Sequence, residues 1–197
     1  MNIAGLAISL LFVSAAASAS APPLPSATIP SPSTVQVALV SNPEMAALFA
    51  ADQADRKGAG PMNWSEVDAR DKTRRARVQE LLDRGWLRTG DDFFGAAFVF
   101  QHGEESNDFL LAHTLAVAAI AQGRSDASWI AAATLDRFLQ KLDRPQIFGT
   151  QYIVKPGEPA TQGAYDRTLI SDKLREVLRV PTLTAQAQRL KQMEAKR

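Results

Sequence analysis

The chain has 197 residues, no cysteine and two histidines, and its 22 Lys and Arg nearly balance its 21 Asp and Glu. This charge balance disfavours a nucleic-acid binder, whose affinity comes mostly from an excess of basic side chains. The lack of cysteine excludes disulfides and thiolate metal sites, and two histidines exclude a His-rich metal centre. We therefore expect no metal, no cofactor and no nucleic-acid partner.

The N-terminal residues are expected to direct export. No charged side chain precedes Glu44, residues 3–19 are apolar or small, and Ala17-Ser18-Ala19 fits the small-x-small pattern of signal-peptidase cleavage. We predict a signal peptide at 1–19 and a Pro/Ser-rich linker at 20–41. An uncleaved anchor is the alternative, but the apolar run is shorter than the about 20 residues of a spanning helix. The mature protein is expected to be periplasmic or extracellular, with no membrane span after signal cleavage.

Residues 42–197 are predicted to form a single α-helical domain. Asn42-Pro43-Glu44 supplies a capping side chain, a proline at the first helical position and an acid in the first turn. Gly85 and Gly123 are expected to end the helices that precede them. Besides the helix that starts at Pro43, we expect helices at about 65–84, 91–103, 106–122, 126–142 and 171–179, and a basic helix at the end of the chain.

Two of these helices have faces that predict their burial. In the helix at 106–122, Leu110, His113, Val117 and Ile120 form one stripe, which we expect to face the core. The helix at 126–142 is apolar on nearly every side and is expected to be central.

Residues 143–168 interrupt the helical pattern with several Pro and Gly and one strand-like run at 151–154. No strands alternate with the helices, which disfavours a parallel-sheet enzyme fold. The predicted fold class is mainly α: a compact multi-helix bundle with helix-pair (tetratricopeptide-like) packing and one irregular loop or short β-hairpin near residues 143–168.

Polar residues interrupt the apolar faces of four predicted helices. In chain order these are Asp52 and Arg56, Asp71 and Arg74, Gln101 and His102, and Asp136 and Arg137. Buried charges cost several kcal/mol unless they are paired and hydrogen-bonded, so we expect these groups to meet one another. Such a network can bind a ligand, or it can only fix the packing of the helices.

The remaining polar signals are a histidine at a helix end and an amide-rich loop. His102 titrates near neutral pH in its ordinary state and is the candidate acid or base, whereas His113 on an apolar stripe is interpreted as a core residue. Gln146, Thr150 and Gln151 offer neutral donors and acceptors to a ligand. Alternatively they satisfy backbone groups of an irregular segment.

The order of these residues resembles a bacterial domain family of unknown function. The matching elements are Asp52-Gln53-x-x-Arg56, Gln101-His102, Asp136-Arg137 and Pro145-Gln146-x-Phe-Gly-Thr-Gln. The most specific part is the signature Asp-Arg…Pro-Gln-x-(Phe/Tyr)-Gly-Thr-Gln, and the resemblance covers about residues 45–183. It implies a shared fold and a shared set of polar positions, but it implies no activity.

Three functions remain open at this point. The first is an exported helical domain that binds a small polar ligand or peptide in a polar pocket. The second is a structural or interaction module with a buried polar network. The third is a hydrolase acting on a cell-envelope substrate, with His102 or Asp136 as general base and Arg137 stabilising negative charge. The candidate pocket residues are Asp52, Arg56, Gln101, His102, Asp136, Arg137, Gln146, Thr150 and Gln151.

Overall fold

A computed structural model describes residues 39–57 and 62–195. The chain divides after Val37, and all described residues belong to the unit Ala38–Arg197. The predicted signal peptide at 1–19 and most of the predicted linker at 20–41 lie outside the described residues. Within the described ranges, no helix combines the length and the hydrophobicity needed to cross a bilayer.

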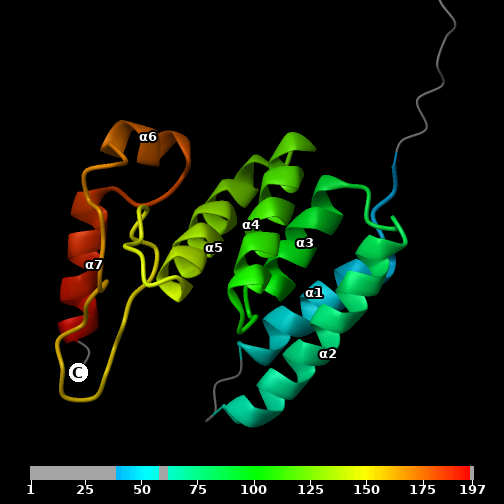
Figure 1. The fold of residues 1–197 in the computed structure, drawn as a ribbon, viewed down its shortest axis with the longest axis horizontal. Coiled ribbons are helices and arrows are strands. Elements are labelled where there is room, and N and C mark those ends of the chain that lie inside the picture. Colours follow the sequence, from blue (N-terminus) through cyan, green and yellow to red (C-terminus); the bar gives the residue numbers. More distant parts are fainter. Residues whose placement is uncertain (1–38, 58–61, 196–197) are drawn as a thin grey trace, which may run out of the picture. The chain divides into compact units, whose positions relative to one another are not determined.

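The described part of the chain is built from seven α-helices and one short 3-10 helix, and it contains no β-strand (Figure 1). In chain order the elements are α1 (Pro43–Asp55), α2 (Trp64–Asp83), α3 (Gly90–Phe100), α4 (Ser106–Ala121), η1 (Ser125–Ala127), α5 (Ser128–Lys141), α6 (Asp172–Val177) and α7 (Leu183–Ala195). The prediction of a mainly α fold is therefore confirmed.

Local capping explains where α1 and α3 begin. The Asn42 side chain accepts hydrogen bonds from the amides of Glu44 (2.9 Å) and Met45 (3.1 Å). Thr89 and Asp92 form a capping box at the start of α3. The carboxylate of Asp92 also accepts a hydrogen bond from the Asn42 amide at 2.7 Å. One acidic side chain therefore links the first turns of two helices.

The main apolar core lies among α1 to α5. Helix α4 packs against both α3 and α5, while α1 and α2 pack on α3 and on each other. Ala96, Ala97, Ala112 and Ala116 are fully buried in this core, and such small side chains let the helices approach closely. Consecutive helices thus form neighbouring pairs, while the tetratricopeptide-like character of the packing stays a prediction.

The buried face of α4 differs from the predicted one. Leu110, Val117 and Ile120 are 40%, 47% and 38% exposed, whereas the buried side of α4 carries Phe109, Ala112, Leu115, Ala116 and Ala119. The helix turns its alanines toward its neighbours because small side chains allow the closest packing, so the larger residues of the predicted stripe lie outside. Helix α5 is also less enclosed than predicted, since its Trp129 is 41% exposed.

The segment between α5 and α6 is irregular, as predicted for residues 143–168. It contains two isolated bridges, which pair Gln146 with Tyr165 and Ile153 with Thr161. Around it lies a second apolar cluster whose buried members are Ala132, Phe148 and Val180. This cluster is far smaller than the main core, so polar contacts must hold much of the C-terminal region.

Candidate functional site

The structure divides the predicted site residues between two polar clusters. The first, here called the α1–α2 cluster, consists of Asp52, Asp55, Arg56, Arg70, Asp71, Arg74 and His102. The second, here called the loop cluster, consists of Asp136, Gln146, Thr150, Gln151, Gln162, Arg175 and Gln186. Gln101 is buried beside His102 after the end of α3, and its side chain belongs to neither set of contacts.

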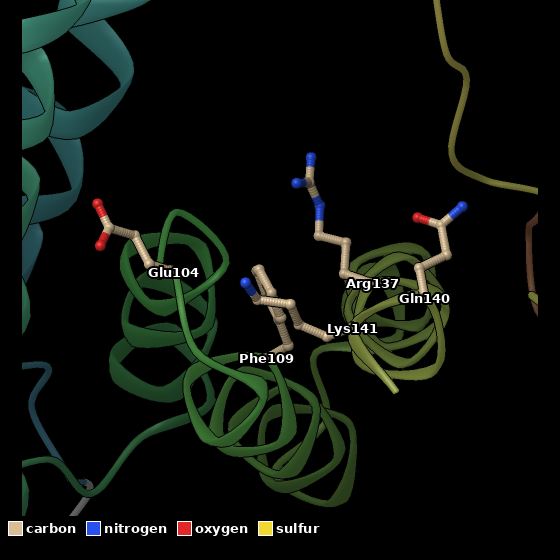
Figure 2. Close-up of a pocket in the computed structure, with 6 residues that line it drawn as sticks. Glu104, Phe109, Arg137, Gln140 and Lys141 are labelled. Atoms are coloured by element: carbon tan, nitrogen blue, oxygen red, sulfur yellow. The ribbon is translucent and has the colours of Figure 1, made fainter. Parts of the chain in front are cut away.

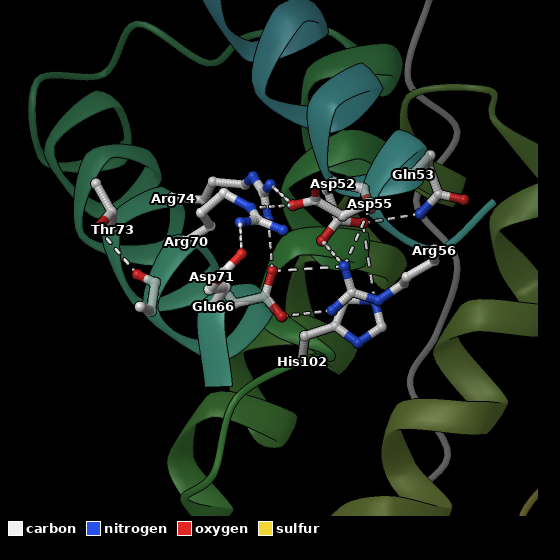
Figure 3. Close-up of polar contacts among 11 residues, drawn as sticks. Asp52, Gln53, Asp55, Arg56, Glu66, Arg70, Asp71, Thr73, Arg74 and His102 are labelled. Carbon is white, nitrogen blue, oxygen red and sulfur yellow. Dashed lines mark hydrogen bonds and ion pairs between the residues drawn. The ribbon is translucent and has the colours of Figure 1, made fainter. Parts of the chain in front are cut away.

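Asp71 lies at the centre of the α1–α2 cluster (Figure 3). Its buried carboxylate binds Arg56, the C-cap residue of α1, and, at 2.6 Å, Arg74 from its own helix α2. Arg56 also contacts Asp52 at 3.0 Å, and this pair was predicted from its spacing of four residues. Because Asp71 holds arginines of two helices, the network fixes α1 against α2.

The outer part of the same cluster is formed by Asp55. Its carboxylate accepts a hydrogen bond from Arg70 at 2.9 Å and is also bound by Arg74. These arginines lower the pKa of Asp55 below its ordinary value. Three carboxylates and three arginines thus alternate across the interface of α1 and α2, an arrangement in which each buried charge has an opposite partner.

His102 lies at the edge of the α1–α2 cluster. Its Nε2 atom is 3.7 Å from Asp52 Oδ2, which is too long for a hydrogen bond, and it is buried without a partner among the described residues. Burial, together with the positive charges of Arg56, Arg137 and Arg75, lowers the pKa of His102 to about 3. The imidazole is therefore neutral and a weak base near pH 7, which disfavours the predicted role in acid–base catalysis.

Asp136 organises the loop cluster. It is fully buried. Its Oδ1 accepts hydrogen bonds from the amides of Ile147 (2.8 Å) and Phe148 (3.0 Å), and its Oδ2 accepts from the amide (2.9 Å) and the hydroxyl (2.8 Å) of Thr150. Both oxygens are thus occupied by donors of the protein itself. This arrangement shapes the loop and disfavours Asp136 as a general base for a substrate.

The predicted glutamines of the loop are also used within the protein. The Gln146 side chain donates to the carbonyls of Gln151 (3.1 Å) and Gln162 (2.5 Å), and it accepts from the Gln151 amide (3.1 Å). The Gln151 side chain donates to the carbonyl of Ala133 (3.2 Å) and to the hydroxyl of Thr150 (2.9 Å). These contacts support the alternative interpretation, in which the amides satisfy an irregular backbone.

Three further residues of the loop cluster were not predicted. Arg175 is fully buried and donates to the carbonyls of Phe148 (2.5 Å), Ile147 (3.2 Å) and Ile170 (3.2 Å). Gln186 donates to Phe148 and Pro181, and Gln162 donates to Gly149 and to the side chain of Gln186. These residues lie in a loop or in helices with mixed sequences, so no periodic pattern marks them as buried.

Arg137 has surroundings unlike those of the buried Arg74 and Arg175. Its Nε atom is buried without a hydrogen-bond partner, and no carboxylate lies within ion-pair distance among the described residues. The residues outside the described ranges contain no Asp or Glu. Burial and the positive charge of Arg56 lower the pKa of Arg137. The fold thus leaves this cation without an anionic partner.

Arg137 lines a pocket of about 410 Å³, here called the Arg137 pocket. Its other lining residues are Gly103, Glu104, Phe109, Gln140 and Lys141. Figure 2 shows Arg137 and Gln140 projecting from α5 in the same direction, while Lys141 points toward Phe109 of α4. The lining thus contains two cations, one amide and one carboxylate, that of Glu104, and this set of groups suits an anionic ligand.

The Arg137 pocket contains only one of the nine predicted site residues. Its remaining polar residues, Glu104, Gln140 and Lys141, were missed because they lie near the ends of helices, where charged side chains are ordinary. Within residues 39–57 and 62–195, no three His, Asp or Glu side chains are placed to share a metal ion.

Comparison with models of protein families, with curated proteins and with solved structures gives no match to this chain. The resemblance to a bacterial family of unknown function therefore stays a prediction. What the protein does has to be inferred from the geometry of its own side chains.

Proposed function

We propose that this protein is an exported binding protein, and that the Arg137 pocket holds a small carboxylate-bearing ligand or the carboxyl end of a peptide. A single observation carries this function: Arg137 is a partly buried cation that no acidic side chain of the chain neutralises. Guanidinium groups bind carboxylates through two parallel hydrogen bonds, and they do so most strongly where water is partly excluded.

The paired arginines of the same protein support this choice. Arg74 and Arg175 are more buried than Arg137, and each is fully served by carboxylates or by carbonyls. An unpaired, partly desolvated charge costs free energy in the unbound protein. A bound carboxylate would recover that cost, and Lys141 would add a second positive charge at the same pocket.

The structural module and the hydrolase, the two alternative functions, have unequal support. The α1–α2 cluster and the loop cluster support a structural role for most of the predicted polar residues, because their groups serve one another. A hydrolase has less support, because Asp136 is fully occupied and His102 is a neutral, weak base. Export, in turn, is inferred from the sequence of residues 1–19 alone.

The binding function is tested by titrating the protein without its predicted signal peptide (residues 20–197) with the dipeptide Ala-Ala and with its C-terminal amide, and the NMR chemical shifts of the protein are followed. We expect saturable shifts with the free carboxylate only. Arg137→Gln should weaken binding by at least about tenfold, equivalent to 1.4 kcal/mol. The matched control is Arg144→Gln, since Arg144 is exposed and lies just after the end of α5. Equal binding by Arg137→Gln, or by the amide, would contradict the proposed site.

Export is tested separately. The full-length chain is expressed in a Gram-negative host, and the N-terminus of the recovered protein is sequenced. Cleavage after Ala19 predicts a periplasmic protein that begins at Ser20. An intact N-terminus in the membrane fraction would favour the uncleaved anchor instead.

A further inference from the structure

Helix α6 buries an arginine and exposes its apolar side chains. Arg175 is fully enclosed, whereas Leu174 and Val177 of the same helix are 43% and 75% exposed. Leu169, shortly before the N-cap residue Ser171, is 60% exposed. In an ordinary amphipathic helix the apolar residues face the core and the charged residues face water. Helix α6 therefore has the reverse of the usual arrangement.

The contacts of Arg175 fix this reversed orientation. Its guanidinium donates to the carbonyls of Phe148, Ile147 and Ile170. Successive residues are about 100° apart around an α-helix, so Val177 lies about 200° from Arg175 and must point outward while the arginine is held inside. The exposed apolar side chains thus follow from the way α6 is attached to the rest of the domain, and turning them inward would break these hydrogen bonds.

A pair of opposite charges accompanies the apolar side chains. The side chains of Lys173 and Glu176 are 94% and 56% exposed, and Lys173 Nζ is 3.7 Å from Glu176 Oε2. A pair so exposed to water contributes little to stability, so both groups remain available to another molecule. From the angular spacing of the helix, this pair lies to one side of Leu174 and Val177. The surface here called the α6 face consists of Leu169, Lys173, Leu174, Glu176 and Val177.

The charge pattern of the α6 face favours a second copy of this chain as its partner. One cation and one anion give the face no net charge, so it does not attract an anionic lipid surface or a strongly charged peptide. Neighbouring charges are engaged elsewhere, since Asp172 accepts from the amide of Leu183 and Arg167 donates to Gln162. A face that carries both charges beside an apolar strip can complement itself.

A twofold axis would bring two α6 faces together in a matching arrangement. In a twofold dimer the same surface of both copies meets, so each contact occurs twice with the roles exchanged. When two helices lie antiparallel about such an axis, corresponding sides of the helices meet. The apolar side of one α6 then faces the apolar side of the other, and Lys173 of each copy faces Glu176 of the other.

We propose that the α6 face is a self-association surface through which two copies of the protein form an antiparallel dimer. Three apolar side chains make a small patch beside the about 800 Å² that each partner buries in a stable complex. We therefore expect a weak dimer, with a dissociation constant of about 0.1–1 mM. The dimer does not depend on the Arg137 pocket, because no residue of the α6 face lines that pocket.

The apolar contact is tested by sedimentation equilibrium of residues 20–197 over about 10 µM to 1 mM. The apparent mass of the wild type should rise with concentration, and Val177→Glu should lower the association constant at least about tenfold, because it places a charge in the apolar strip. The matched control is Val117→Glu on α4, where the valine is 47% exposed; it should associate like wild type. A constant monomer mass in wild type, or equal association of the two variants, would overturn the proposal.

The reciprocal charge contact is tested by reversing the two charges. Lys173→Glu alone and Glu176→Lys alone each place like charges opposite one another in the dimer, so each should associate several-fold more weakly than wild type. The double variant restores opposite charges at both contacts and has the net charge of the wild type, so it should associate like wild type. An equimolar mixture of the two single variants should recover as well. If neither the double variant nor the mixture recovers, the antiparallel dimer is wrong.

Discussion

Asp136 and Arg137 are neighbours on α5, yet their side chains have opposite surroundings. Asp136 is fully buried and accepts four hydrogen bonds from the loop that follows the helix. Arg137 lies at a pocket with no anionic partner. Since adjacent residues point about 100° apart around a helix, one dipeptide contributes a structural anchor on one side and an unpaired cation, the proposed binding group, on the other.

Replacing Asp136 by Asn tests its structural role. The amide keeps the size of the side chain but loses the charge, and its NH₂ group faces donors instead of acceptors. We expect a loss of about 3 kcal/mol in the free energy of unfolding, or about 6–12 °C in melting temperature. Asp143→Asn, at an exposed position nearby, is the control. Equal melting temperatures of the two variants would show that the loop does not depend on the carboxylate.

Arg137→Met should stabilise the unliganded protein. Methionine replaces the aliphatic part of the arginine side chain with a similar unbranched chain. It removes the partly buried charge and the repulsion between that charge and Arg56. We expect a gain of about 1 kcal/mol, or about 2–4 °C, in thermal unfolding. Arg144→Met serves as the comparison at an exposed position. A clear decrease in melting temperature would instead indicate that the guanidinium supports the fold.

Asp71→Asn should destabilise the protein strongly. It leaves Arg56 and Arg74 facing each other without the carboxylate that both of them bind. Removing one partner of a buried ion pair costs about 3–5 kcal/mol, which urea unfolding would measure. Asp68→Asn on the exposed side of α2 is the matched control and should have little effect. If both variants unfold at the same urea concentration, the α1–α2 cluster does not hold the two helices together.

His102 should make the protein less stable as the pH falls. Its pKa is about 3 in the folded protein and about 6.5 in the unfolded chain, so the unfolded chain binds the proton first. The free energy of unfolding therefore decreases as the pH drops from about 6.5 toward 3. Relative to His102→Gln, the wild type should lose about 2 kcal/mol more between pH 7 and pH 4.5.

The comparison with His102→Gln isolates this effect because the other titrating groups are common to both proteins. Asp52 acts in the opposite sense, since burial raises its pKa. Asp52 is present in both proteins, as are the charged groups that face position 102, namely Arg56, Asp71, Arg75 and Arg137. Identical slopes of stability against pH would show that His102 is freely accessible to protons.

The sequence predicts those features of the fold that depend on neighbouring residues in the chain. The Asn42 cap, the end of α2 at Gly85 and the order of the helices follow from local signals. The face that α4 buries does not, because Leu110 and Val117 are exposed only as a consequence of how α3 and α5 pack. The spacing of apolar residues within one helix does not predict which of its faces the neighbouring helices will cover.

The same limit applies to the candidate site. The ion pair of Asp52 and Arg56 is predictable from a spacing of four residues. Which polar residues meet across the fold is not, because Gln162 and Gln186 lie 24 residues apart and meet only once the loop and α7 have docked. Likewise, that Arg137 has no acidic partner among the described residues becomes evident only from the positions of the Asp and Glu side chains in the folded protein.

The small size of the apolar cluster around Phe148 has a consequence for how the protein unfolds. Residues after α5 are bonded to that helix through Asp136 and the carbonyl of Ala133, and the buried apolar members of the second cluster are Ala132, Phe148 and Val180. We expect this C-terminal region to open as a separate cooperative unit, before the helices of the main core. Because little apolar surface becomes wet, that first step should have a small heat-capacity change and a weak dependence on denaturant.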